Sequence, residues 1–296
     1  MKLFEYFNKP KYAAYIFLLP SMITLLIFSF FPIAGAIIIS LMKLNIYFIE
    51  PSFVGLSNYL KLFEDVRFWN AIKNTFVFTV TEVPFQIVIG LLVANALSKS
   101  SLFSQITRSI LFVPTVCSMT AIGITFSILM DRIGFVPYLA TRFLGAPEIG
   151  YFRDIRTAMP TVVGMTVWKS FGYTMAILVV GINNISRSYY EASEIDGASK
   201  LTQFAYITIP CLLPNIGFCL ITNIIGALQV FDQIYVTTQG GPQYKTETLV
   251  QYIYKTGFSG PFDLGYSAAM SVLLMVIIVC ISLSLYIRIF ISSRDY

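Results

Sequence analysis

The chain has 296 residues, of which 56% are hydrophobic and only 12% are charged, and its formal net charge is +5. Soluble domains carry roughly 25% charged residues, so this composition indicates an integral membrane protein. No histidine is present, which excludes any mechanism that needs an imidazole base, relay or metal ligand.

Other function classes also lack their sequence signals. No run of lysines and arginines could follow a nucleic acid. Neither GxxxxGK[ST] nor GxGxxG occurs, so this chain is not expected to bind a nucleotide through either loop. The cysteines lie in apolar segments without a CxxC pair, and we expect small core residues rather than disulfides or a zinc site: Cys117, Cys211, Cys219 and Cys280.

Six segments are apolar enough for a transmembrane helix of about 20 residues. They are residues 13–42, 74–97, 109–130, 157–183, 211–231 and 265–287. The first is long enough to tilt or kink at Pro20 and Pro32. Pro84 and Pro114 lie in the second and third, where neighbouring helices or a water-filled path must satisfy the freed carbonyls.

The N-terminus resembles a cleaved signal, because lysines precede an apolar run and Ala34-Gly35-Ala36 imitates a cleavage site. The run exceeds the roughly 7–15 residues of a signal peptide, so we expect a retained helix. Lysines and arginines are shared almost equally between the two sides. Lys2, Lys9 and Lys11 favour a cytoplasmic start, and six spans return Arg288 and Arg294 to that side.

The polar segment between the fourth and fifth spans differs from the rest of the chain. Residues 187–200 are charged and free of proline. Glu191, Glu194 and Asp196 are expected early in a helix, where acidic groups suit the N-terminus, and Gly197 can supply a bend. The pattern predicts two short helices that project as a handle, whereas in a generic membrane protein it would be a solvated loop.

The same segment contains a motif. Glu191-Ala192-Ser193-x-x-x-Gly197, nine further residues and then Ile207-x-Ile209-Pro210 resemble the EAA motif of the permease subunits of ABC importers. Ser193 stands where the family usually has alanine, and Ile209 where it usually has leucine.

Further motifs resemble the sugar-permease branch of that family, of the maltose and glycerol-phosphate type. They cover nearly the whole chain: Phe53-Val-Gly-Leu-Ser-Asn-Tyr59, Phe68-Trp69, Asn74-Thr75, Trp168-Lys169, Phe231-Asp232, Thr238-Gln-Gly-Gly-Pro242 with Thr246 and Thr248, Tyr252-Ile-Tyr254 and Gly265-Tyr-Ser-Ala-Ala269.

The resemblance implies an all-α type I importer permease fold with six transmembrane helices in a bacterial cytoplasmic membrane. Its expected parts are a cytoplasmic N-terminal segment (1–12), a peripheral first helix (13–42), an outer loop (43–73), a five-helix core (74–287) that includes a coupling loop (187–210), and a cytoplasmic tail (288–296).

The resemblance also implies partners: a second permease subunit, a cytoplasmic ATPase dimer that binds ATP and magnesium, and an external substrate-binding protein. This chain itself is expected to be neither an enzyme nor a cofactor protein. The residues implied in docking to the ATPase are Glu191, Ala192, Ser193, Asp196, Gly197, Ile207 and Pro210.

Polar residues inside the spans are candidates for the substrate pathway, because such groups are costly in a membrane and usually face a cavity. Glu82 and Gln86 are four apart in one span, as are Lys169 and Tyr173 in another, so each pair shares a helix face. A sugar needs amides, carboxylates and an aromatic face, whereas the alternative is bonding between helices, including a Glu82–Lys169 ion pair. The candidates are Glu82, Gln86, Trp168, Lys169, Tyr173, Asn223, Gln229 and Asp232.

The leading hypothesis is therefore one permease of an ATP-driven, binding-protein-dependent carbohydrate importer. A self-sufficient transporter coupled to protons through Glu82 is the alternative, but it leaves the EAA-like loop unexplained. An intramembrane enzyme is disfavoured, since no histidine and no serine–lysine or aspartate pair is suitably placed.

Overall fold

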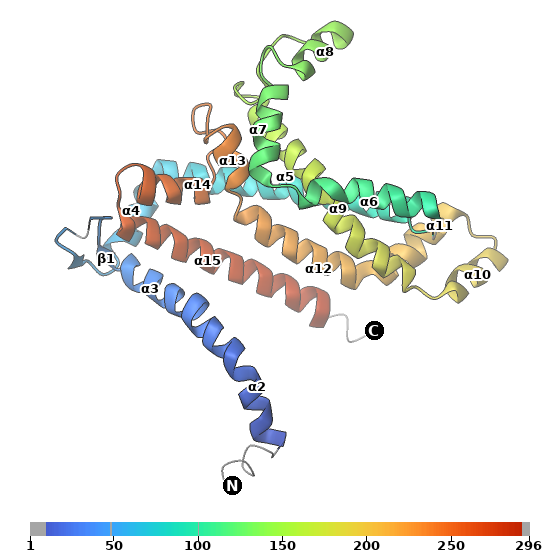
Figure 1. Ribbon diagram of the computed structural model, residues 1–296, viewed down its shortest axis with the longest axis horizontal. Coiled ribbons are helices and arrows are strands. Elements are labelled where there is room, and N and C mark those ends of the chain that lie inside the picture. Colours follow the sequence, from blue (N-terminus) through green and yellow to red (C-terminus); the bar gives the residue numbers. More distant parts are fainter. Residues whose placement is uncertain (1–9, 48, 100, 292–296) are drawn as a thin grey trace. The chain divides into compact units, whose positions relative to one another are not determined.

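The computed structural model describes residues 10–47, 49–99 and 101–291. Helices make up most of this part of the chain (Figure 1), because a backbone in lipid must satisfy its own hydrogen bonds. This confirms the predicted all-α membrane fold. Three residues used to predict the orientation, Lys2, Lys9 and Arg294, lie outside the described residues.

The chain divides into two compact units, which are described separately. The first comprises Met1–Glu64 and Ile253–Leu274, and the second comprises Asp65–Tyr252 and Met275–Tyr296. The described elements of the first are α2 (Pro10–Leu25), the π-helical turn η1 (Leu26–Phe30), α3 (Phe31–Ser40), β1 (Met42–Lys43), β2 (Ser52–Phe53), α4 (Ser57–Glu64), the π-helical turn η3 (Lys255–Ser259) and the beginning of α15 (Leu264–Tyr286).

The second unit contains the remaining helices. They are α5 (Val66–Ala96), α6 (Leu102–Val116), α7 (Met119–Leu129), α8 (Phe135–Leu144), α9 (Ala158–Asn183), α10 (Arg187–Ile195), α11 (Lys200–Gln203), η2 (Phe204–Thr208), α12 (Ile209–Leu228), α13 (Asp232–Thr237), most of α14 (Leu249–Tyr254), the end of α15 and η4 (Ile287–Ile291).

Among the described residues, five helical stretches are long and apolar enough to cross a membrane, and each overlaps a predicted span. They are Phe17–Ser40, Val66–Ala96, Ala158–Asn183, Lys200–Leu228 and Leu264–Ile289. The predicted span 109–130 is instead the pair α6 and α7, bent by 93°. The number of spans is therefore five, or six where the bent pair crosses as one.

The bend between α6 and α7 lies at Cys117 and Ser118. Their ψ angles are 147° and 132°, whereas a continuing helix needs about −42°. Pro114 has no N–H, so the helical partner of the Ile110 carbonyl is missing. The Cys117 amide donates to the Pro114 carbonyl at 3.2 Å, which ends α6. The helix therefore breaks just after Pro114.

Two other prolines leave their helices continuous. Pro32 follows η1 and Pro210 follows η2. A proline ring collides with the carbonyl four residues earlier in an α-helix, and the wider π turn accommodates it. Consequently the helix of the fifth span begins at Lys200, and its first turns extend beyond the apolar segment predicted from residue 211.

The second span also begins earlier than predicted, at Val66 rather than at residue 74. The Asp65 carboxylate accepts hydrogen bonds from the amides of Arg67 (2.8 Å) and Phe68 (3.2 Å). It therefore caps the N-terminus of α5. Polarity had suggested a loop here, but the cap extends the helix beyond its apolar run.

The first unit is held together by residues of two sequence motifs. The Asn58 amide donates to the carbonyls of Ser40 and Met42, each at 2.9 Å, and the Tyr59 and Ser40 hydroxyls share a hydrogen bond of 2.7 Å. A Cβ on Gly265 would overlap the Met42 carbonyl oxygen. The motif residues thus fix the outer loop to the start of α15.

A salt bridge joins the beginning of α5 to the loop after α13 in the second unit. Arg67 binds the Glu247 carboxylate through two hydrogen bonds, at 2.7 and 2.8 Å, and lies over the rings of Tyr244 and Tyr252. The Glu247 side chain is fully buried. The Asn74 amide donates to the carbonyls of Tyr244 and Glu247, so the loop after α13 is fixed to α5.

The prediction that all four cysteines are core residues is wrong for three. All are free, but only Cys219 is buried, whereas Cys117, Cys211 and Cys280 are exposed. A lipid-facing helix side is as apolar as a core, so apolar neighbours do not distinguish the two. The largest apolar core of the second unit includes Phe78, Val162, Met165 and Ile234.

Replacing Arg67 should destabilise the protein, because the buried Glu247 carboxylate would lose the cation that binds it through two hydrogen bonds. We expect Arg67→Ala to lower the free energy of unfolding by about 3 kcal/mol, measured by thermal unfolding of the purified protein in detergent. The control is Lys245→Ala, which removes an exposed cation from the same loop. Equal unfolding temperatures for the two variants would contradict the importance of this salt bridge.

Candidate functional site: a polar cavity and a projecting loop

The segment between α9 and α12 forms the predicted handle in part: α10 is a separate short helix, whereas α11 is the first turn of a helical stretch that continues through η2 into α12 (Lys200–Leu228). Figure 1 shows α10 and α11 beyond the ends of the two long helices that they connect. The Gly197 amide donates to the Glu194 carbonyl at 3.1 Å, and the Ala198 amide to the Ser193 carbonyl at 2.9 Å. This is a Schellman motif, whose left-handed position is Gly197 at φ +74°. The elbow therefore requires glycine.

The acidic residues of the handle do not lie where they were expected. No acidic residue lies in the first turn of α10, and Asp196 is its C-cap. The helix begins at Arg187, so Glu191 and Glu194 fall in its middle and last turn. The Lys200 ammonium donates to the Glu194 carboxylate at 2.6 Å. This contact stabilises the charged carboxylate and holds the pKa of Glu194 below its ordinary value.

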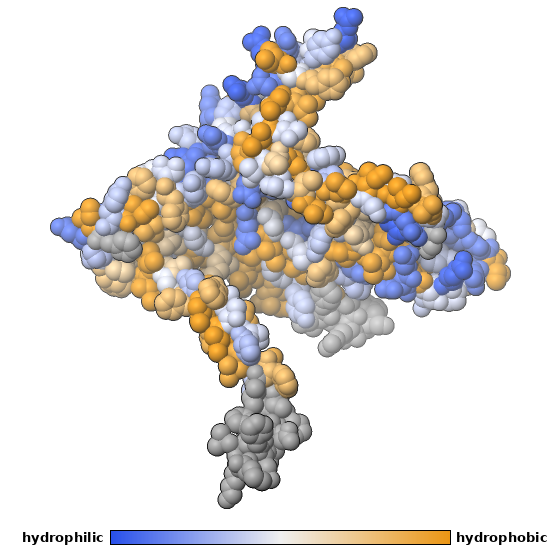
Figure 2. Space-filling view, in the orientation of Figure 1, coloured by the Kyte–Doolittle hydropathy of each residue, from blue (hydrophilic) through white to orange (hydrophobic). Residues whose placement is uncertain are grey.

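The remaining motif residues occupy both helices and the start of α12. Glu191 and Ala192 are exposed on α10, whereas Ser193 is half-buried. Ile207 is half-buried in η2, and Pro210 is exposed at the second position of α12. In Figure 2 hydrophilic surface gathers over the α10–α11 segment, beside the apolar surface of α6.

A polar cavity of about 270 Å³ lies inside the second unit. Four of the eight predicted pathway residues line it, namely Glu82, Gln86, Tyr173 and Asn223. The other lining residues were not predicted, although Thr166, Ser170 and Tyr173 follow the helical spacing of one face. The additional lining residues are Phe78, Thr115, Thr166, Ser170, Thr222, Gly226, Ala227 and Gln233.

Thr174 is the hydrogen-bonding centre behind this cavity. Its hydroxyl oxygen accepts from the Gln86 amide at 3.1 Å and from the Asn223 amide at 3.2 Å. A Cβ on Gly90 would lie 2.8 Å from Thr174 Cγ2, so glycine permits the close approach of α5 and α9. Three helices thus meet at one buried threonine that the sequence analysis missed.

Glu82 is buried, with 4% of its surface exposed. Among the described residues it has no hydrogen-bond or ion-pair partner. The alternative, an ion pair with Lys169, is not formed: the Lys169 ammonium donates to the Thr115 carbonyl at 3.2 Å instead. The carboxyl of Glu82 is therefore available to a molecule in the cavity.

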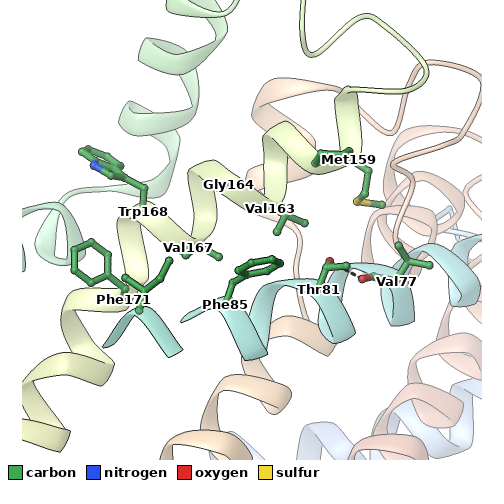
Figure 3. A pocket seen from close by; sticks show the side chains of 11 residues that line it. Val77, Thr81, Phe85, Met159, Val163, Gly164, Val167, Trp168 and Phe171 are labelled. Carbon is green, nitrogen blue, oxygen red and sulfur yellow. Dashed lines mark hydrogen bonds between the residues drawn. The ribbon is translucent and has the colours of Figure 1, made fainter. Parts of the chain in front are cut away.

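The other predicted pathway residues lie elsewhere. Gln229 and Asp232 are exposed, at the end of α12 and the beginning of α13. Trp168 packs against Phe126 at 5.3 Å between ring centres. It lines a separate apolar groove of about 630 Å³ between α5 and α9, in which Figure 3 shows Phe85 among the lining side chains.

No group of three or more histidine, cysteine, aspartate or glutamate side chains could hold a metal ion in the described part of the chain. The polar groups of the cavity are instead amides, hydroxyls and one carboxyl. Such groups hydrogen-bond well to a neutral polyhydroxylated molecule.

Replacing Thr174 by valine should loosen the cavity, because two buried amides would lose their shared acceptor. We expect Thr174→Val to reduce stability by about 1–2 kcal/mol, measured by thermal unfolding in detergent. Thr125→Val is the matched control, since that exposed hydroxyl bonds only to its own helix at Ala121. If both variants unfold alike, Thr174 does not join the three helices.

Comparisons with known proteins identify the family. Residues 86–295 match the family described as "binding-protein-dependent transport system inner membrane component". The lactose transport system permease protein LacF of Rhizobium radiobacter is 34% identical over 90% of this chain and 91% of its own length. The sulfoquinovosyl glycerol transport system permease protein SmoG of Agrobacterium fabrum is 32% identical over 95% of this chain and 91% of its own length.

A solved structure has the same fold. A chain of the bacterial alginate ABC transporter, crystallised with an alginate pentasaccharide-bound periplasmic protein, superposes with a TM-score of 0.81. It is 22% identical and covers 96% of both chains. This supports the predicted type I importer permease fold, and the family disfavours a self-sufficient transporter. The chain belongs to the family of binding-protein-dependent transport system inner membrane components, the multi-pass permease subunits of ABC importers.

Proposed function

We propose that this chain is one of two permeases that form the translocation pathway of an ATP-driven carbohydrate importer in a bacterial cytoplasmic membrane. The observation that carries the proposal is the projecting handle α10–α11 on a chain whose sequence has no nucleotide-binding loop. Such a permease must receive work from another protein. The second permease, the ATPase dimer and the external binding protein are its proposed partners.

Exposed apolar side chains on the handle support docking to the ATPase. Ile195 and Leu201 are 88% and 78% exposed on the handle, and Tyr206 in the adjoining turn η2 is 79% exposed. Apolar groups on a water-facing segment are typical of protein interfaces. Glu191 lies on the same handle, and we assign it a contact with the ATPase, which holds ATP and magnesium.

The polar cavity supports a carbohydrate as the transported molecule. Glu82, Gln86 and Asn223 can bind hydroxyls, and Tyr173, which is 44% exposed, offers an aromatic face. The relatives are consistent with this chemistry, because they are named as permeases for lactose, sulfoquinovosyl glycerol and arabinooligosaccharides. Gln229 and Asp232 are exposed and do not line this cavity, and their proposed place is on the pathway outside it.

The proposed orientation has both termini in the cytoplasm, with residues 1–12 and 288–296 flanking the spans. The handle then lies on the ATPase side, and the loop fixed by Arg67 and Glu247 lies on the side of the binding protein. Closure of the ATPase dimer would rotate the handles as rigid bodies. Docking of the loaded binding protein would favour the outward-facing state, so that substrate stimulates turnover.

Two handle variants should release the ATPase without preventing membrane insertion. Glu191→Lys reverses a charge of the handle, and Gly197→Pro cannot adopt φ +74° because proline is restricted to about −65°. After affinity purification of the tagged chain from its native membrane, we expect at least about tenfold less co-purified ATPase.

The matched controls repeat the same changes in the segment that follows α8. Glu148 is exposed, and Gly145 is also left-handed at φ +64°. Glu148→Lys and Gly145→Pro should retain the ATPase. If the handle variants also retain it, the handle is not the docking element.

Two cavity variants should impair transport while leaving the complex assembled. Glu82→Ala and Asn223→Ala each remove a group that binds hydroxyls, and we expect KM for the sugar to rise by about tenfold. Uptake is measured in proteoliposomes with whichever of lactose, arabino-oligosaccharide or sulfoquinovosyl glycerol most stimulates ATP hydrolysis. Glu148→Ala is the control, and an unchanged KM in both cavity variants would place the sugar elsewhere.

A further inference from the structure

We propose that a hydrogen-bond network centred on Gln203 and Tyr190 locks the two handle helices to the beginning of α12 and transmits the motion of the ATPase into that span. The proposal rests on the coupling function proposed above. It assigns positioning roles to residues outside the predicted docking set, and adds a role for Ser193.

The handle has no apolar core of its own. None of the residues of α10 is buried, and the only buried residue of α11 is a glutamine, Gln203. α10 contains nine residues, and an isolated helix of this length is unstable in water. α11 is the first turn of the helix that continues into α12, so α10 is the part that needs support. Polar contacts must therefore hold the handle in shape.

Gln203 joins the two helices across the glycine elbow. Its amide nitrogen donates to the Ser193 hydroxyl at 2.9 Å and to the Tyr190 carbonyl at 3.4 Å. Ser193 in turn donates to the same carbonyl at 2.8 Å. The amide oxygen of Gln203 accepts from Lys200, which also binds Glu194 at 2.6 Å. With 4% of its surface exposed, Gln203 gains little from water if these bonds break.

Tyr190 extends the network to the span. Its hydroxyl shares a hydrogen bond of 2.9 Å with the Thr208 hydroxyl. Thr208 is 2% exposed and directly precedes the first residue of α12. A continuous set of hydrogen bonds thus leads from Glu194 on α10, through Gln203, to the start of the transmembrane helix.

Rigid transmission requires that α10 and α12 move together. If the network is cut, the ATPase can still bind the exposed face of the handle, but its movement deforms the elbow instead of turning the span. The expected result is futile hydrolysis, in which ATP is consumed and little sugar is moved. Replacing a residue needed only for folding would instead reduce the amount of assembled complex. The complex that still assembles would move the normal amount of sugar per ATP.

The test compares variants of the complete transporter purified from its native membrane and reconstituted into proteoliposomes. Gln203→Met keeps the size of the side chain without its hydrogen bonds, and Tyr190→Phe removes only one hydroxyl. We expect each to retain the ATPase and to move about fivefold less sugar per ATP. Lactose, arabino-oligosaccharide and sulfoquinovosyl glycerol are compared first, and the sugar that most stimulates ATP hydrolysis is used. Ser186→Ala, whose hydroxyl bonds only to exposed Ser188, should transport normally.

Two further measurements separate transmission from stability. The double variant Gln203→Met with Tyr190→Phe should be no worse than the worse single variant, since both cut one network. Spin labels on Ser188→Cys and Phe218→Cys, with the native cysteines replaced, report the distance between α10 and α12. This distance should be the same in the nucleotide-free and vanadate-trapped states of the otherwise unmodified complex. When Gln203 is replaced, the distance should change between the states or its distribution should broaden.

The outcomes distinguish the two proposals. Absence of an ATPase from the unmodified complex would overturn the proposed function itself. Retention of the ATPase with unchanged sugar per ATP in the Tyr190→Phe and Gln203→Met variants would overturn the network alone. If Gln203→Met fails to assemble, Tyr190→Phe decides the matter, because it changes a single hydroxyl on a half-buried side chain.

Discussion

A polar group inside a membrane must find its partner within the protein, and this constraint governs the second unit. Thr174 satisfies it for three helices, because one hydroxyl oxygen accepts from amides on α5 and α12. Glycine at position 90 brings α5 and α9 close enough for these bonds. The cavity is formed beside this junction, and Glu82 is the carboxyl that the junction leaves without a partner.

The handle obeys a different constraint, since it lies outside the apolar spans and lacks an apolar core. Its shape depends on a left-handed glycine at the elbow and on polar contacts across that elbow. Its exposed apolar side chains remain available to another protein. Together these properties suit a segment that must keep its shape while another protein binds it. In the proposed function these are two separate sites: the cavity binds the cargo, and the handle receives the work of the ATPase.

Much of this arrangement could be predicted from the sequence, because the length and hydropathy of a membrane span are strong signals. The four-residue spacing of Glu82 and Gln86 correctly predicted a shared face, and Gly197 correctly predicted the elbow. The break at Cys117 could not be predicted, since a proline in a span causes a kink, a π turn or a break according to its surroundings. Gln203 was missed because its partners lie across the elbow, where helical periodicity gives no information.

The most direct measurement of the central claim is uptake of radiolabelled carbohydrate into proteoliposomes that contain the complex purified through this chain. The binding protein is supplied outside, and the proton gradient is collapsed. The account predicts uptake that requires ATP on the handle side and stops when ATP is omitted. Uptake by this polypeptide alone, driven by a proton gradient and independent of ATP, would contradict it.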